Sequence, residues 1–156
     1  DFASAVAVAD DGSLYLTGTF QGNVDFDFGP GTFELETDDE SKTAVFVSKY
    51  GPDRSFLWAL AFAASVPAED ASDLGLGIAT DSQNNVYICG MIGNTVDFTG
   101  LGSTSDYYGG SDCFLVKLDS TGVCQWSKVW GGSGNDRANA VAVGDNVVFV
   151  TGSYEG

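Results

Sequence analysis

The sequence predicts an all-β fold built of four-stranded antiparallel blades. The first observation is an internal repeat, because residues 5–18 (AVAVADDGSLYLTG) recur in modified form at 77–90 and 140–152. The second is a fixed spacing: Lys49 and Lys117 are 68 residues apart, and the same offset separates Trp58 from Trp126. The third is that no segment keeps the period of an amphipathic helix. A four-stranded meander that recurs roughly every 60–70 residues is typical of a β-propeller blade.

Four strands are expected in the first unit, at residues 5–8, 14–20, 44–50 and 56–62. In these segments Val, Tyr, Phe and Thr alternate with smaller or polar residues, as strands require. Asp, Gly and Ser residues supply the turns between the first two strands and between the last two. Each copy of the first hairpin closes on a glycine, which makes Gly18, Gly90 and Gly152 repeated structural positions.

The repeat divides the chain into three parts. Residues 1–70 and 71–136 are expected to be complete blade repeats, and 137–156 the first hairpin of an incomplete third blade. Unequal periods are explained by surplus residues in 20–43 and 64–76, which are interpreted as variable loops. Two blades and a hairpin cannot close a ring. We therefore expect either a longer propeller of about six to eight blades or completion by other copies of the chain.

The composition argues against several function classes. Twenty-two Asp and Glu residues against six Lys and Arg give a formal net charge of −16, so nucleic acid is not an expected partner. The absence of His removes the commonest general base and the commonest zinc ligand. No apolar run approaches the roughly 20 residues that a membrane helix needs. We expect no cofactor, no catalytic residues and no membrane span.

Several short motifs of the second unit belong together. They are TVDF (95–98), GGSDxFxVK (109–117), DxxGxxxW (119–126) and GGSGND (131–136). With the AVAV…VTG hairpin, they resemble the SBBP-type β-propeller repeat of secreted and cell-surface proteins. The resemblance implies a propeller fold, an extracellular or cell-surface location and no assigned catalytic residues. It departs in the first unit, where Ala63-Ala64 replaces Gly131-Gly132.

These features together predict a non-enzymatic extracellular scaffold or interaction module. Its partners would be further blades of the same chain or other copies of itself. The alternative is a ligand-binding propeller that takes a glycan or calcium. A more distant alternative is a quinoprotein-like oxidoreductase, because Asp119–Trp126 resembles the docking hairpin of those enzymes. Quinoproteins, however, need many blades and a charged cofactor shell.

Two sets of residues are candidate ligand sites. Trp58 and Trp126 could serve as stacking platforms for sugars, but their repeated offset favours packing between strands or blades. Asp25 and Asp27 are weak candidates for a calcium site because carboxylate oxygens suit that ion. Their surroundings match neither an EF-hand nor a glycine-aspartate calcium repeat, so a solvated acidic loop is the simpler interpretation.

The last predicted strand, residues 147–154, is expected to be an assembly edge. Neither Lys, Arg nor Pro interrupts it, so it can accept another strand. We expect the continuing chain, or the next copy in a head-to-tail array, to pair with this edge. A head-to-tail contact that does not close produces a filament. The residues that form the edge are Val147, Val148, Phe149, Val150, Thr151 and Tyr154.

The three cysteines occupy ordinary strand positions. Only Cys89 and Cys113, on adjacent predicted strands, are placed for a disulfide. Three buried thiols, with Cys124 as the third, is the simpler expectation.

Overall fold

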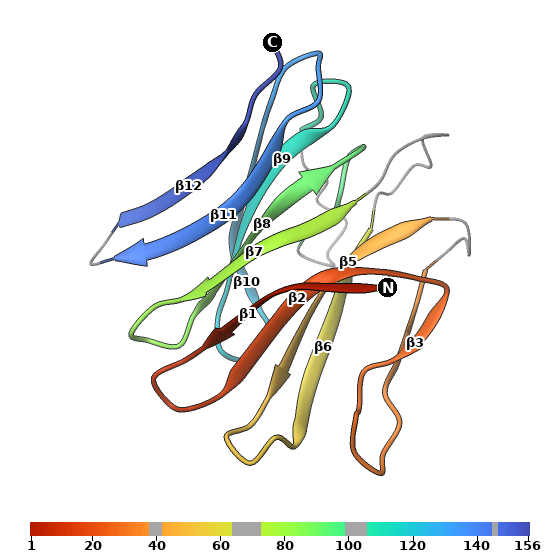
Figure 1. Cartoon of the computed structure of the whole chain (residues 1–156), viewed down its shortest axis with the longest axis vertical. Helices are drawn as coiled ribbons and strands as arrows, with labels where there is room; N and C mark the ends of the chain where they lie inside the picture. The colour runs from red at the N-terminus through yellow and green to blue at the C-terminus, as the bar shows by residue number, and fades with distance from the viewer. Residues whose placement is uncertain (38–41, 64–72, 99–105, 145–146) are drawn as a thin grey trace.

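The computed structural model describes residues 1–37, 42–63, 73–98, 106–144 and 147–156, which form twelve β-strands and no helix (Figure 1). Consequently, these residues contain no helix long and apolar enough to cross a membrane. The strands are β1 (Phe2–Val8), β2 (Leu14–Gln21), β3 (Asn23–Asp25), β4 (Glu34–Glu36), β5 (Thr43–Tyr50), β6 (Phe56–Phe62), β7 (Leu74–Thr80), β8 (Val86–Ile92), β9 (Asp112–Leu118), β10 (Cys124–Trp130), β11 (Arg137–Gly144) and β12 (Val147–Ser153).

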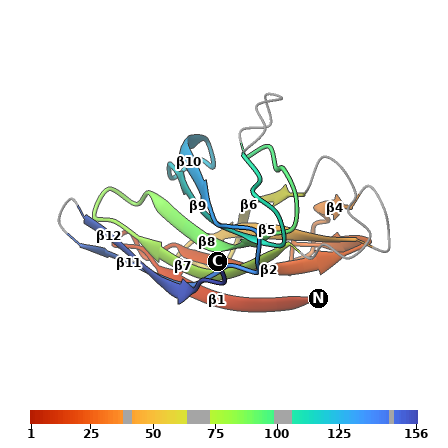
Figure 2. The ribbon, with the colours of Figure 1, turned by 90° about the horizontal axis from the view of Figure 1, so that it is seen from above.

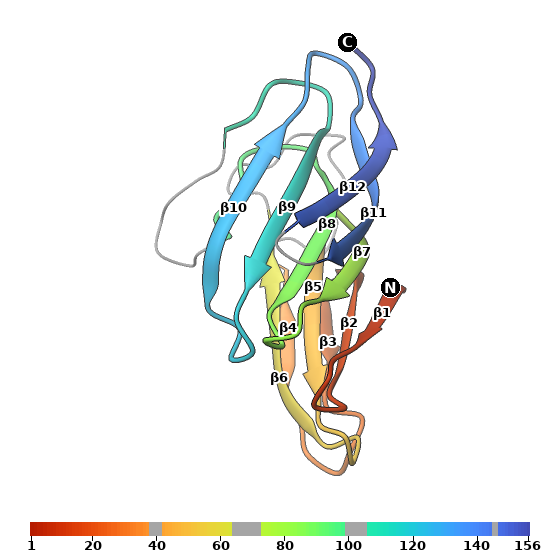
Figure 3. The same cartoon turned by 90° about the vertical axis from the view of Figure 1, so that its left-hand side faces the viewer.

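Two four-stranded antiparallel sheets dominate the structure. Blade 1 has the order β1-β2-β5-β6, and blade 2 has the equivalent order β7-β8-β9-β10, whose strands run side by side in Figure 3. Strands β11 and β12 form a separate hairpin. The predicted all-β class with repeated four-stranded meanders is confirmed. The sheets do not close into a ring, and the expected boundary at residues 70 and 71 lies outside the described residues.

The interpretation of residues 20–43 as a loop was incomplete. The short hairpin β3–β4 lies within this segment. Phe26, which follows β3, packs edge-on against Phe20 at 5.4 Å between ring centroids and also contacts Phe46. This small aromatic cluster covers part of the face of blade 1 that is turned away from blade 2. Three-residue strands are too short to leave a clear alternation in sequence, which explains why they were missed.

The main core lies between the two blades. Val45 and Val47 of β5 face Ile88 of β8 and Val116 of β9, and all four side chains are fully buried. A second cluster forms between blade 2 and the β11–β12 hairpin. Figure 2 shows the inner strands β1, β7 and β11 along one side of the molecule and the outer strands β6 and β10 along the other. The sheets therefore stack face to face in chain order, as neighbouring blades do.

The repeated glycines are explained by a bulge in each inner strand. The pairing register shifts between Ala3 and Ala5, between Gly75 and Gly77, and between Ala138 and Ala140. The bulge brings a carbonyl group of the inner strand over the glycine of the next strand. A Cβ atom on that glycine would overlap the carbonyl, so no other residue fits without moving the backbone. The overlapping pairs are Gly18 with Phe2, Gly90 with Leu74 and Gly152 with Arg137.

Candidate interaction face

A row of Tyr, Lys and Trp crosses the last three strands of each blade, near one end of these strands. In both rows the lysine Nζ lies over the tyrosine ring, at 5.1 Å in blade 1 and 5.0 Å in blade 2. The tyrosine and tryptophan rings meet edge to face at 6.0 Å in each blade. The rows are Tyr15–Lys49–Trp58 in blade 1 and Tyr87–Lys117–Trp126 in blade 2.

A bulge in the outer strand aligns each row. The register of blade 2 shifts between Cys124 and Trp126, so that Trp126 rather than Gln125 pairs with Lys117. Blade 1 shows the same shift at its fourth strand, which places Trp58 opposite Lys49. The residues that share the 68-residue offset thus occupy the same register in the two blades. Each tryptophan also contacts the tyrosine of its own blade.

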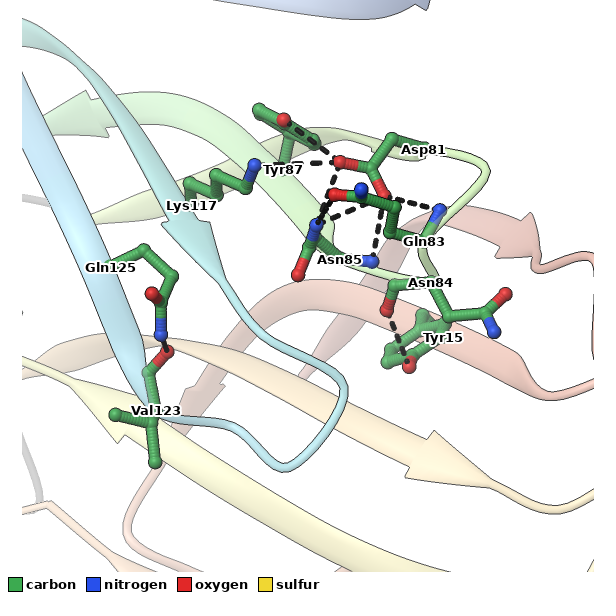
Figure 4. A network of polar contacts seen from close by, with 9 residues as sticks. All are labelled: Tyr15, Asp81, Gln83, Asn84, Asn85, Tyr87, Lys117, Val123 and Gln125. Atoms are coloured by element: carbon green, nitrogen blue, oxygen red, sulfur yellow. Dashed lines mark hydrogen bonds and ion pairs between the residues drawn. The ribbon is translucent and has the colours of Figure 1, made fainter.

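The row of blade 1 binds two turns of blade 2. Lys49 Nζ donates a hydrogen bond of 3.0 Å to the carbonyl of Ser120, and Trp58 Nε1 donates one of 3.3 Å to the same oxygen. The Tyr15 hydroxyl donates to the carbonyl of Asn84 at 3.3 Å, as Figure 4 shows. Ser120 lies in the β9–β10 turn and Asn84 in the β7–β8 turn. The row is therefore a receptor for the turns of the next blade.

The row of blade 2 lies instead in an open groove of about 760 Å³. Here Trp126 remains 36% exposed. Val143 and Gly144 of β11 and Val147 and Val148 of β12 line one wall, but the described residues supply no counterpart of the Ser120 turn. Residues lining the groove include Asp81, Tyr87, Lys117, Trp126, Val143 and Val148.

Asp81 lines the polar side of this groove. Its carboxylate lies 3.4 Å from Lys117 Nζ and accepts a hydrogen bond of 3.1 Å from the Tyr87 hydroxyl (Figure 4). Burial acts to raise the pKa of Asp81, but hydrogen bonds, first from Asn85, together lower it. Hydrogen bonding to Tyr87 is the largest cause of the raised pKa of Lys117. Blade 1 has the apolar Ala9 at the matching position, so this acid is specific to blade 2.

The predicted assembly edge lies beside the groove. Strand β12 pairs with β11 on one side, and among the described residues no strand pairs with its other side (Figure 1). Val148 and Val150 pack against the cluster beneath the hairpin. Val147, Phe149 and Tyr154 are exposed, with Phe149 at 64%. Thr151, the sixth predicted residue, is also exposed and pairs with Ala140.

The opposite end of the stack is apolar as well. Val6 of β1 is 62% exposed, whereas Ile78 and Val141, which occupy the matching positions of β7 and β11, pack against the preceding sheet. Phe2 and Val8 extend this exposed stripe along β1. The exposed positions are thus those that a preceding blade would cover.

A repeated aspartate, which was not predicted from the sequence, connects the two ends of each hairpin. One oxygen of an aspartate that precedes each inner strand accepts a backbone hydrogen bond from the end of the following strand. The pairs are Asp1 with Gln21 N at 3.0 Å, Asp73 with Gly93 N at 3.0 Å, and Asp136 with Glu155 N at 2.7 Å. The signal available in the sequence was Asp at 1, 73 and 136, in each case two residues before the alanine or glycine at which the bulge begins.

The remaining predicted candidates form no shared site. All three cysteines are free thiols. Burial raises the pKa of Cys89 to about 12 and that of Cys113 to about 11. Asp25 and Asp27 bind backbone N–H groups of their own hairpin, including Phe33 N and Gly29 N. No group of three or more potential metal-binding side chains was found in the described residues.

Comparison with known proteins supports the repeat architecture. No protein-family model matches the chain. A protein of Acanthamoeba polyphaga mimivirus, described as an uncharacterized WD repeat-containing protein, is 28% identical over 159 residues. The match covers 96% of this chain but only 11% of that protein. This chain has no His and no Trp-Asp dipeptide, so the likeness does not rest on the WD signature itself. Blades and likeness together indicate a propeller-type repeat protein.

Proposed function

We propose that the chain is a non-enzymatic scaffold of an extracellular or cell-surface propeller, and that it binds further blades at its two open ends. The observation that carries this proposal is the use of the Tyr-Lys-Trp row. In blade 1 the row holds two turns of blade 2. In blade 2 the same three residue types lie in an open groove beside the edge of β12 that pairs with no other described strand.

A hairpin equivalent to β9–β10 would complete both features at once. Its first strand would pair with β12, and the carbonyl of its turn would accept hydrogen bonds from Lys117 and Trp126. The hairpin comes either from the continuing chain or from another copy. In the second case, the exposed stripe of Phe2, Val6 and Val8 offers a different surface at the opposite end, so the contact is head-to-tail and favours a filament.

The SBBP-like motifs support the extracellular part of the proposal. They supply the resemblance to secreted and cell-surface repeats, and the distant WD repeat relative supports an interaction scaffold of the propeller type. Antibody staining of source cells, with and without permeabilisation, tests the location. Staining that requires permeabilisation would contradict a surface location.

An extended chain tests the docking hairpin. A second copy of residues 95–130 is appended after Gly156, where the repeat places the missing half of the blade. We expect hydrogen exchange in residues 147–154 to slow and the melting temperature to rise. Lys117→Met should reduce that rise, whereas Lys128→Met, which changes an exposed lysine outside the row, should not.

Sedimentation of the unextended chain separates the two sources of the hairpin. Association that grows with concentration and weakens in Lys117→Met supports completion by another copy. A monomer at all concentrations, together with a protected edge in the extended chain, assigns completion to the continuing chain. If residues 147–154 exchange rapidly in both proteins, the docking proposal is wrong.

A further inference from the structure

Two buried carboxylates face each other where blade 2 meets the β11–β12 hairpin. Asp112 is the first residue of β9, Asp136 immediately precedes β11, and both are 0% exposed. One oxygen of Asp112 accepts a 2.8 Å hydrogen bond from Tyr108 N. The two oxygens of Asp136 accept bonds of 2.6 Å from Gly132 N and 2.7 Å from Glu155 N. Short bonds from backbone N–H groups favour the ionised form of a carboxylate.

The other oxygen of Asp112 has no hydrogen-bond partner. Oδ1 is buried, and it points into the space that Gly131 leaves by lacking a side chain. A Cβ atom on Gly131 would overlap Asp112 Oδ1 and would lie 2.6 Å from Asp136 Oδ2. The two oxygens therefore converge on one small space lined by carboxylates.

No cationic side chain of the described residues forms an ion pair with either carboxylate. Among the described residues, the ion pair found is that of Lys117 with Asp81, and neither Asp112 nor Asp136 forms one. Burial raises the pKa of Asp112, and repulsion from Asp136 raises it further. Buried charges need a counter-charge or a proton, because an unpaired ion in a protein interior is costly.

We infer that Asp112 and Asp136 form a calcium-binding site. Ca²⁺ takes carboxylate and backbone carbonyl oxygens in flexible arrangements, and the glycine-rich segment 131–134 leaves the backbone accessible beside the pair. The ion would neutralise the two carboxylates and satisfy Asp112 Oδ1. It would also join β9 to the segment that leads into β11, and so fix the third hairpin on blade 2.

The first blade lacks both features of this site. Ala44 stands where blade 2 has Asp112, and Ala63 stands where blade 2 has Gly131. Asp73 accepts the same kind of backbone hydrogen bond as Asp136, so this bond does not require Asp112. Asp112 and Gly131 occur together in blade 2 and are both replaced in blade 1, as expected if both are needed for the calcium site. Blade 1 is therefore an internal control.

Calcium titration of the 156-residue chain tests the inference. The apo protein is prepared with a chelator and melted with increasing CaCl₂. At a hundredfold excess over Kd we expect the melting temperature to rise by about 5–10 °C. Asp112→Asn and Gly131→Ala should abolish the rise, whereas Asp25→Asn, which removes an exposed acid elsewhere, should retain it. A second measurement is the emission of bound Tb³⁺, excited through Trp130, which is adjacent to Gly131 in the sequence. In the native chain, added Ca²⁺ should displace Tb³⁺ and reduce this emission.

Three results would overturn the site. One is a native chain with neither a calcium-dependent rise nor displaceable Tb³⁺ emission. Another is a rise that survives in Asp112→Asn. The third is an Asp112→Asn variant that melts higher than the native chain, with no calcium response in either, which would show that the pair shares a proton. None of these results bears on the docking hairpin, whose test uses Lys117 and the β12 edge.

Discussion

Replacing Lys49 with Met tests the idea that the row of blade 1 holds blade 2. Met keeps the unbranched apolar stem of Lys but cannot donate to the carbonyl of Ser120. Lys49 is only 7% exposed, so its interactions are largely shielded from water. Losing a hydrogen bond from a charged donor costs about 1.5–3 kcal/mol. Losing the cation–π contact with Tyr15 costs about 0.5–2 kcal/mol.

The combined loss of free energy should be smaller than the sum of these two values, because Trp58 continues to donate to the same Ser120 oxygen. We therefore expect Lys49→Met to lower the free energy of unfolding by about 2–3 kcal/mol. Lys117→Met removes the equivalent lysine of blade 2, whose side chain is 20% exposed and forms its ion pair with Asp81 of its own blade. Its loss should cost about 1 kcal/mol, from a weak ion pair and an exposed cation–π contact.

Urea denaturation followed by circular dichroism measures both variants, with Lys128→Met as the control for removing an exposed lysine. We expect Lys49→Met to destabilise the chain most, Lys117→Met less, and Lys128→Met least, with the last within about 0.5 kcal/mol of the native chain. Equal destabilisation by Lys49→Met and Lys117→Met would refute this expectation. That result would mean that the row stabilises its own blade and contributes nothing across the boundary.

Three further predictions follow from single contacts. Gly90→Ala should lower the free energy of unfolding by more than about 2 kcal/mol, because its Cβ would overlap Leu74 O; Gly144→Ala, with open space around it, is the control. Folding lowers the pKa of Asp81, so its carboxylate stabilises the chain fully above the ordinary pKa of 3.8 and loses this contribution as the pH falls through the folded-state pKa. In urea denaturation at a series of pH values, the free energy of unfolding of Asp81→Asn should therefore fall less steeply in acid than that of the native chain. Labelling with iodoacetamide at pH 8, followed by mass spectrometry, should modify Cys124 before Cys89, whose burial raises its pKa to about 12.

Strand positions were predictable from the sequence because the repeat reports them more than once. The expected strands at 44–50 and 56–62 match β5 and β6 to within one residue. Gly18, Gly90 and Gly152 were recognisable as one position, although the reason for glycine was not. That reason is a bulge, and a bulge depends on the pairing of two strands rather than on the residues of either one.

The candidate site was only partly predictable for the same reason. The offset between Trp58 and Trp126 indicated packing, and both rings do contact a tyrosine. That Lys49 donates to Ser120, 71 residues away, follows from the stacking of two sheets. No local pattern encodes which turn of one sheet lies over which side chain of another. Such contacts were accessible only from the three-dimensional arrangement.

Differences between the repeats carry information that their similarities do not. Residues shared by both blades, such as Lys49 and Lys117, are explained by the architecture, because each blade needs the same contacts with its neighbour. Asp112 and Gly131 cannot be explained in this way, since blade 1 folds with Ala at both positions. A buried carboxylate with an oxygen that lacks a hydrogen-bond partner, as Asp112 Oδ1 does, destabilises a sheet unless something compensates for it. Its restriction to blade 2, against which the β11–β12 hairpin packs, points to a requirement of that junction, because an ion there would fix the hairpin on the sheet.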